Sequence, residues 1–142
     1  MRLIFILGFC IAVVSCKKNA EKAIQTWQLK QYTEFDSLGD RKEGFSFSEE
    51  CPFKIFEIKE NTWSKYDIDC GGIQIDVTDG YYSVDGDTLI VDGLDLNGNS
   101  YADWYLINRL TRKKMDIELI RSKDINGEWQ WVNKRTYSYI KS

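Results

Sequence analysis

The sequence predicts an all-β fold: one domain of antiparallel strands, connected up and down and closed into a barrel of about eight strands. Three observations favour it. Aromatic residues make up 14% of the chain and proline occurs once, a composition that suits strands. Several segments alternate apolar and polar residues, as a strand with one buried face does. Glycine, asparagine and aspartate separate these segments at turn-like breaks.

The strands are expected between residue 27 and the end of the chain. The segment IQIDVT (73–78) alternates clearly, with Ile73, Ile75 and Val77 on one face. KMDIELIR (114–121) alternates in the same way, whereas SLGDRKEG (37–44) is expected to be an exposed loop. Further strands are predicted in WQLKQY, FKIFEIK, TWSKYDID, YYSVD, TLIVD and ADWYLINRL. The last strand, EWQWVNKRTYSYIK, has four aromatic residues at alternate positions of one face: Trp129, Trp131, Tyr137 and Tyr139.

Hairpins are expected to join these strands. Asp85-Gly86, between YYSV and DTLIV, is a favoured two-residue turn because both positions tolerate positive φ. A set of short strands must hide its edges, and closing the sheet into a barrel removes them completely. A sandwich of two sheets remains the alternative, because local sequence patterns do not distinguish the two.

The first 26 residues predict export and a lipid anchor. Residues 3–14 are apolar or small throughout, which is too short for a helix that spans a bilayer and typical of a signal peptide. The following Val13-Val14-Ser15-Cys16 resembles the bacterial lipobox. That resemblance implies cleavage before Cys16 and acylation of its thiol, palmitate included. We therefore expect a signal peptide over 1–15, a tether over 16–26 and the barrel domain over 27–142.

This anchor predicts a location on the cell envelope, at the outer membrane. Two or more acyl chains give stable membrane attachment. Lys17 and Lys18 follow the cysteine and do not resemble the acidic signals that direct some lipoproteins to the cell surface. The periplasmic side is therefore favoured over the surface.

Composition argues against two classes of function. The net charge is −3 and no basic cluster occurs, which argues against nucleic acid as a partner, since such binding depends on neutralising phosphates. The chain contains no histidine, so the usual general base, the nucleophilic triads and the commonest zinc ligand are missing. We expect a protein that is not an enzyme and needs no cofactor.

Two cysteines bracket a predicted hairpin. Cys51 and Cys70 flank FKIFEIK and TWSKYDID, so the hairpin would bring its far ends, and the two thiols, together. In an oxidising envelope such a pair usually forms a disulfide, which closes a loop of this length with a gain of roughly 3 kcal/mol. Two free thiols are the alternative, and a redox pair is disfavoured because there is no Cys-x-x-Cys motif.

One loop has the spacing of a weak calcium site. Asp95, Asn97, Asn99 and Asp103 stand at positions 1, 3, 5 and 9 of DLNGNSYAD, which resembles the calcium loops of integrin-type repeats. Ca²⁺ takes six to eight oxygen ligands, and only two of these four residues are carboxylates. An Asn-Gly turn whose polar side chains bond to their own backbone is the favoured alternative, so no metal is predicted.

The order of motifs from Trp27 onward resembles the lipocalin-like lipoproteins of Bacteroidota. The resemblance is carried by WQL (27–29), by the hairpin between the two cysteines, by YLINRLT (105–111) and by the alternating strand after it. It implies a calycin-type barrel behind a lipobox, covering most of residues 27–141. In lipocalins a basic residue of the last strand often packs across the opening tryptophan. The resemblance thus implies a cation–π contact between Arg135 and Trp27, with an exposed arginine as the alternative.

A barrel of eight strands is wide enough to be filled by side chains or to hold one small ligand. The favoured function is the binding of a small apolar or amphipathic ligand inside the barrel. Candidates to line the cavity are Trp27, Trp129, Trp131, Tyr137 and Tyr139. The same aromatic residues could instead fill a core or form an exposed platform for sugars. The alternative function is a protein-interaction module of the inhibitor or immunity type, with a filled barrel that binds another envelope protein.

Overall fold

The computed structural model describes residues 21–46, 52–94, 98–123 and 126–142. Within these ranges it contains nine antiparallel strands in one sheet. Their bounds are β1 (Thr26–Phe35), β2 (Arg41–Ser46), β3 (Phe53–Ile58), β4 (Thr62–Ile68), β5 (Gln74–Asp85), β6 (Thr88–Leu94), β7 (Ser100–Leu110), β8 (Lys114–Lys123) and β9 (Trp129–Lys141).

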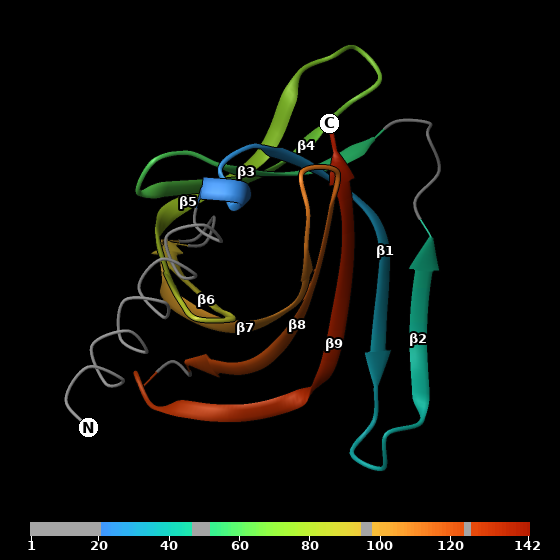
Figure 1. Cartoon of the computed structure of the whole chain (residues 1–142), viewed down its shortest axis with the longest axis vertical. Helices are drawn as coiled ribbons and strands as arrows, with labels where there is room; N and C mark the ends of the chain where they lie inside the picture. The colour runs from blue at the N-terminus through green and yellow to red at the C-terminus, as the bar shows by residue number, and fades with distance from the viewer. Residues whose placement is uncertain (1–20, 47–51, 95–97, 124–125) are drawn as a thin grey trace, which may run out of the picture.

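Eight of these strands form a closed barrel. The strand order runs β1-β3-β4-β5-β6-β7-β8-β9, and β9 pairs again with β1. Figure 1 shows the long, curved β7, β8 and β9 wrapping around the interior to reach β1. The predicted all-β antiparallel barrel is confirmed, and the sandwich alternative is wrong because a single sheet closes on itself.

Strand β1 is the seam of the barrel. Along one edge it pairs with β9, from Trp27 opposite Lys141 to Glu34 opposite Arg135. Along the other edge, residues 26–28 pair with β3 and residues 31–35 pair with β2. The second half of β1 therefore has β2, and not β3, as its neighbour, and β2 stands outside the barrel (Figure 1).

The segment predicted as an exposed loop over 37–44 contains part of β2. Five of the six residues of this strand are exposed and the sixth is intermediate, so no alternation marks it in the sequence. It is held by backbone pairing with β1 and by the stacking of Phe45 on Tyr32, with ring centroids 6.2 Å apart.

The core lies inside the barrel and is closed by the opening tryptophan. Trp27 has no exposed surface, and its indole N–H donates to the carbonyl of Ala23 at 2.9 Å. Ala23 belongs to a helical turn over residues 21–23 and is 1% exposed. Other fully buried side chains come from strands around the barrel: Phe56, Ile58, Trp63, Leu89, Val91, Met115 and Ile117.

The alternation in residues 73–78 does not produce a buried face. Ile73, Ile75 and Val77 are 62%, 41% and 45% exposed. The pairing of β5 with β6 begins only at Asp79, so the first part of β5 has β4 as its only neighbour. This β4–β5 hairpin projects beyond the body of the barrel, as Figure 1 shows.

Over the described ranges, no helix has the length and apolar character that crossing a membrane requires.

Strands β5 and β6 approach each other closely at two glycines. A Cβ atom at Gly80 would overlap the carbonyl oxygen of Asp92, and one at Gly93 would overlap that of Asp79. The indole N–H of Trp63 donates to the carbonyls of Tyr81 and Asp92, at 3.0 Å each. The absence of side chains at the glycines therefore lets Trp63 bind both strands from inside.

We expect Gly80→Ala to lower the free energy of unfolding by about 2 kcal/mol, the usual cost of overpacking. The added methyl meets backbone, which cannot rotate away as a side chain can. Urea unfolding followed by circular dichroism measures the change, with the exposed Ser83→Ala in the same strand as control. Equal stability of the two variants would show that the strands separate at little cost.

Candidate functional site

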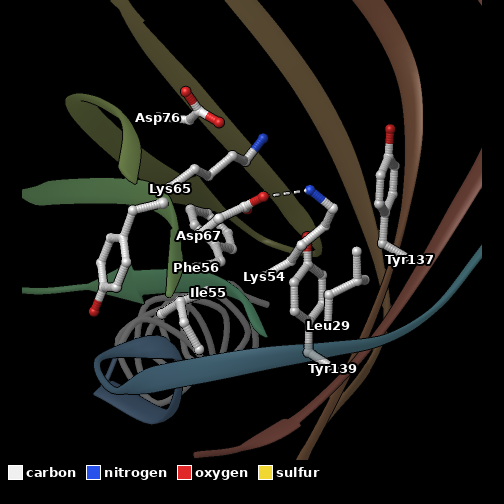
Figure 2. Close-up of a pocket in the computed structure, with 10 residues that line it drawn as sticks. Leu29, Lys54, Ile55, Phe56, Lys65, Asp67, Asp76, Tyr137 and Tyr139 are labelled. Atoms are coloured by element: carbon white, nitrogen blue, oxygen red, sulfur yellow. Dashed lines mark hydrogen bonds and ion pairs between the residues drawn. The ribbon is translucent and has the colours of Figure 1, made fainter. Parts of the chain in front are cut away.

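A pocket of about 200 Å³ opens on the side of the barrel (Figure 2). Its walls combine apolar and aromatic side chains with a few charged groups. The lining comes from β1, β3, β4, β5 and β9 and comprises Leu29, Lys54, Ile55, Phe56, Lys65, Tyr66, Asp67, Asp76, Tyr137 and Tyr139.

The pocket follows from the seam. β1 and β3 pair only through Thr26, Trp27 and Gln28, and Leu29, the next residue of β1, lines the pocket. The wall opposite is formed by β3 and β4, while Tyr137 and Tyr139 of β9 complete the interior side. The β1–β3 pairing thus closes the barrel wall over residues 26–28 of β1, and the pocket begins where this pairing stops.

Lys65 is a half-buried charged residue of the pocket lining whose ammonium lies among aromatic rings of the barrel interior. It follows Trp63 by two residues on β4, so the pleat directs both side chains to the interior. Its ammonium lies over three aromatic rings, at 5.3 Å from the centroid of Phe56, 5.4 Å from Trp63 and 5.3 Å from Tyr105. Contacts of this kind are worth about 0.5–2 kcal/mol each when desolvated.

A chain of hydrogen bonds lies behind this ammonium. Lys65 Nζ donates to the hydroxyl oxygen of Tyr105 at 3.2 Å, and the Tyr105 hydroxyl donates to Asp103 Oδ2 at 3.1 Å. The hydroxyl of Ser122 donates to Asp103 Oδ1 at 2.6 Å. Each carboxylate oxygen of Asp103 therefore already accepts a hydrogen bond from a neutral hydroxyl.

Burial sets the protonation of this cluster. Desolvation lowers the pKa of the Lys65 ammonium, and the Asp103 carboxylate opposes that shift without cancelling it. Desolvation also raises the pKa values of Tyr105, Tyr137 and Tyr139 well above the ordinary value. The three phenols therefore remain neutral hydrogen-bonding groups at physiological pH.

A second polar group lies farther along β1. The Tyr32 hydroxyl donates to Glu34 Oε2 at 2.6 Å, and Arg135 Nε lies 3.4 Å from the same oxygen. Desolvation and Glu34 raise the pKa of Tyr32 to about 12, whereas the Tyr32 hydrogen bond lowers the pKa of Glu34. The ring of Tyr137 lies between the two groups. Its centroid is 5.2 Å from that of Tyr32 and 5.9 Å from that of Tyr105.

The position of Arg135 corrects the cation–π contact that the resemblance implied. Arg135 pairs in register with Glu34, whereas Trp27 lies opposite Lys141. Glu34 is seven positions after Trp27 along β1, a distance of about 23 Å at 3.3 Å per residue. Arg135 is thus neither packed on Trp27 nor a fully exposed arginine, because it forms an ion pair with Glu34.

The rim of the pocket carries its own charges. Lys54 Nζ and Asp67 Oδ2 form an ion pair at 2.7 Å, drawn as a dashed line in Figure 2. Asp76 lies on the same side, is exposed, and has a φ of 53° at the register shift between β4 and β5. The rim is therefore polar, while the charge inside is that of Lys65.

Two of the five aromatic residues predicted to line a cavity do so. Tyr137 and Tyr139 line the pocket, whereas Trp27 belongs to the closed core. Trp131 is 75% exposed, while its neighbour Val132 packs against the core. The prediction of one continuous aromatic face on β9 is therefore corrected.

The physical reason is an irregular register between β8 and β9. Leu119 is opposite Arg135 and Arg121 is opposite Trp131, so two steps along β8 correspond to four along β9. Arg121 lies 5.8 Å from the ring centroid of Trp129 and 5.0 Å from that of Trp131. Both indoles thus pack around Arg121, which is half-buried, and not around the pocket.

The cysteine predictions fall partly outside the described residues. Cys16, the signal peptide over 1–15 and the tether up to residue 20 lie there, and so does Cys51. Cys70 lies in the described loop between β4 and β5. The Cys51–Cys70 disulfide and the acylation of Cys16 remain predictions.

The calcium loop is not supported where it can be checked. Asp95 and Asn97 lie outside the described residues, and Asn99 is exposed. Asp103 is a residue of β7 whose carboxylate accepts hydrogen bonds from Tyr105 and Ser122 inside the barrel. No group of three or more acidic, cysteine or histidine residues suited to a metal is found in the described part of the chain.

Sequence reasoning missed Lys65 and the interior role of Asp103. A signal for Lys65 was present, because TWSKYDID alternates and places Lys65 on the same face as Trp63. Charged residues are almost never fully buried unless paired, so pattern alone favours an outward lysine. Only the closed barrel shows that this face is the interior.

Two solved structures have a similar architecture. One is a lipocalin-like protein from Bacteroides uniformis, with a TM-score of 0.54 and 15% identity, covering 85% of this chain and 99% of that chain. The other is a protein from Bacteroides eggerthii, with a TM-score of 0.55 and 14% identity, covering 84% of this chain and 98% of that chain. The fold is a lipocalin-like barrel. At these identities the likeness concerns the fold alone. No protein-family model matches the sequence, and no curated protein matches it significantly.

The lipocalin-like barrel should become more stable when Lys65 is replaced by methionine. At pH 7 we expect Lys65→Met to raise the free energy of unfolding by about 1 kcal/mol, because an ammonium taken out of water without a carboxylate in contact is costly, whereas the methionine side chain has no charge to desolvate. The gain should shrink as the pH rises toward 10.4, where the lysine of the unfolded chain also loses its proton.

Thermal unfolding at pH 7 and pH 10 measures this difference. Lys54→Met is the matched control, since Lys54 is exposed and its ion pair with Asp67 lies at the rim. A Lys65→Met protein less stable than the wild type at pH 7 would mean that the ammonium stabilises the barrel.

Proposed function

We propose that this lipocalin-like barrel binds a small apolar or amphipathic molecule in the pocket between β1, β3, β4 and β9. The observation that carries the proposal is the pocket itself: about 200 Å³, open to the surface, with mainly apolar walls and a few fixed polar groups. Ligand sites in proteins have this character.

The pocket volume limits the part of the ligand that is enclosed. Pockets for drug-sized molecules measure about 300–1,000 Å³, whereas a cavity of about 150 Å³ encloses a benzene ring. A pocket of about 200 Å³ fits a short acyl chain or a single ring. A longer molecule would leave its remainder outside the mouth.

Binding without chemical turnover is the favoured role. The sequence contains no histidine, and both oxygens of Asp103 accept hydrogen bonds from hydroxyl groups. Asp103 is therefore poorly placed to act as a general base. The pocket residues support recognition of a molecule more than its conversion.

We also propose that the protein is held on the cell envelope by a lipid on Cys16. The apolar segment over 3–14 followed by Ser15-Cys16 supports this. Glu21, where the helical turn against Trp27 begins, is five positions after Cys16, and a chain of that length spans at most ~18 Å. The barrel would therefore sit close to the membrane that carries the anchor.

Metabolic labelling with radioactive palmitate tests the anchor. We expect label on the wild-type protein and none on Cys16→Ala, with Cys10→Ala labelled as strongly as the wild type. An unlabelled wild-type protein in cells that label other lipoproteins would contradict the anchor.

Isothermal titration calorimetry with 1-octanol tests the pocket. We expect Leu29→Trp to weaken octanol binding at least tenfold, because the indole would fill the space beside Tyr139. Leu106→Trp places the same side chain at a position of β7 that is 36% exposed, and it should bind octanol as the wild type does. Equal binding by both variants, or none by the wild type, would argue against a ligand in this pocket.

A further inference from the structure

The charge inside the pocket identifies the chemical class of the ligand. Figure 2 shows the Lys65 side chain directed toward the middle of the lining residues. Three aromatic rings surround its ammonium, and the hydroxyl of Tyr105 is its one hydrogen-bond partner among the described residues. An ammonium can donate three hydrogen bonds, so Lys65 can donate to a bound molecule as well.

No carboxylate of the described chain is in direct contact with this ammonium. Asp103 lies behind Tyr105, and its oxygens are held by the hydroxyls of Tyr105 and Ser122. At the rim, Asp67 is paired with Lys54 at 2.7 Å. Asp76 is exposed, so water screens its charge.

Stability does not explain a lysine at this position. Taking an ammonium out of water is expensive unless a counter-ion and hydrogen bonds replace its hydration. The aromatic rings and one phenol replace it only in part, and burial lowers the pKa of Lys65 accordingly. An anion that enters the pocket would supply a counter-charge in direct contact with this ammonium.

We infer that the pocket takes an amphiphile that ends in a carboxylate, with the carboxylate at Lys65 and the apolar chain along Leu29, Phe56 and Tyr139. This inference rests on the proposed ligand-binding function and specifies its ligand. One ammonium balances one negative charge, and a carboxylate is small enough to leave most of the roughly 200 Å³ to the chain.

The test compares three probes of equal chain length: octanoate, 1-octanol and octylamine. Equilibrium dialysis measures the binding of each radiolabelled probe to the full chain, purified in one detergent. At pH 7 we expect octanoate to bind at least tenfold more tightly than octanol, and octylamine to bind most weakly. Detergent affects all protein variants equally, so differences between variants report on the pocket.

Two matched variants locate the effect. Lys65→Met should weaken octanoate binding at least tenfold while octanol binding changes less than threefold. Lys113→Met removes one positive charge from the exposed turn between β7 and β8, outside the pocket lining, and its octanoate binding should stay within threefold of wild type. Circular dichroism confirms that each variant is folded.

The outcomes separate this inference from the proposed function. If octanol and octanoate bind equally, or if Lys65→Met leaves octanoate binding unchanged, the carboxylate inference is wrong and the apolar pocket stands. If Lys113→Met weakens octanoate binding as much as Lys65→Met does, the effect comes from the overall charge of the protein, and the carboxylate inference is wrong. If none of the three probes binds to the wild type, both proposals are overturned.

Discussion

The closure of the sheet at β1 is the constraint on which the rest of the structure depends. β1 pairs with β9 along most of its length, and with β3 only over residues 26–28. The first pairing makes an interior, because it turns an open sheet into a barrel without edges. The second pairing is short, and beyond it the wall opens into the pocket. An interior and an entrance to it thus arise from the two edges of one strand.

This closure determines the electrostatics of the interior. In an open sheet, Lys65 would lie on a hydrated face, and its ammonium would lose little hydration free energy. In the barrel its ammonium is enclosed by Phe56, Trp63 and Tyr105, and the nearest carboxylate is one phenol away. Natural proteins often give up some stability at functional sites. We interpret Lys65 as such a case, in which the bound molecule restores what burial takes away.

Much of the fold could be predicted from the sequence, because strand alternation and hairpin turns are local properties. The strand pattern of residues 114–121 is where the sequence indicates it. The hairpin between β5 and β6 is also present, but its turn lies one residue later than predicted: Asp85 pairs with Thr88, so Gly86 and Asp87 form the turn, and Gly86 has the positive φ. β2 could not be predicted in this way. Most of its residues are exposed, so it lacks the alternation that burial imposes, and only its backbone pairing with β1 defines it.

The site was predicted only in part, and register is the reason. Tyr137 and Tyr139 line the pocket as alternation suggests, but the irregular pairing of β8 with β9 turns Trp131 outward. The ion pair of Arg135 with Glu34 likewise depends on the register of β9 against β1. Register is set by pairing between distant segments, and no single strand contains that information.

The titration of the Lys65 side-chain amine is the most direct test of a buried charge inside a closed barrel. It can be followed by NMR of lysine ε-carbons, with Lys65→Met to assign the signal. We expect the ε-amine of Lys65 to titrate clearly below the ordinary lysine value of about 10.4 in the free protein. Its pKa should shift upward when octanoate is bound. A Lys65 that titrates at the ordinary value, with or without octanoate, would show that this side chain is hydrated and would contradict a closed barrel with a buried charge at its binding site.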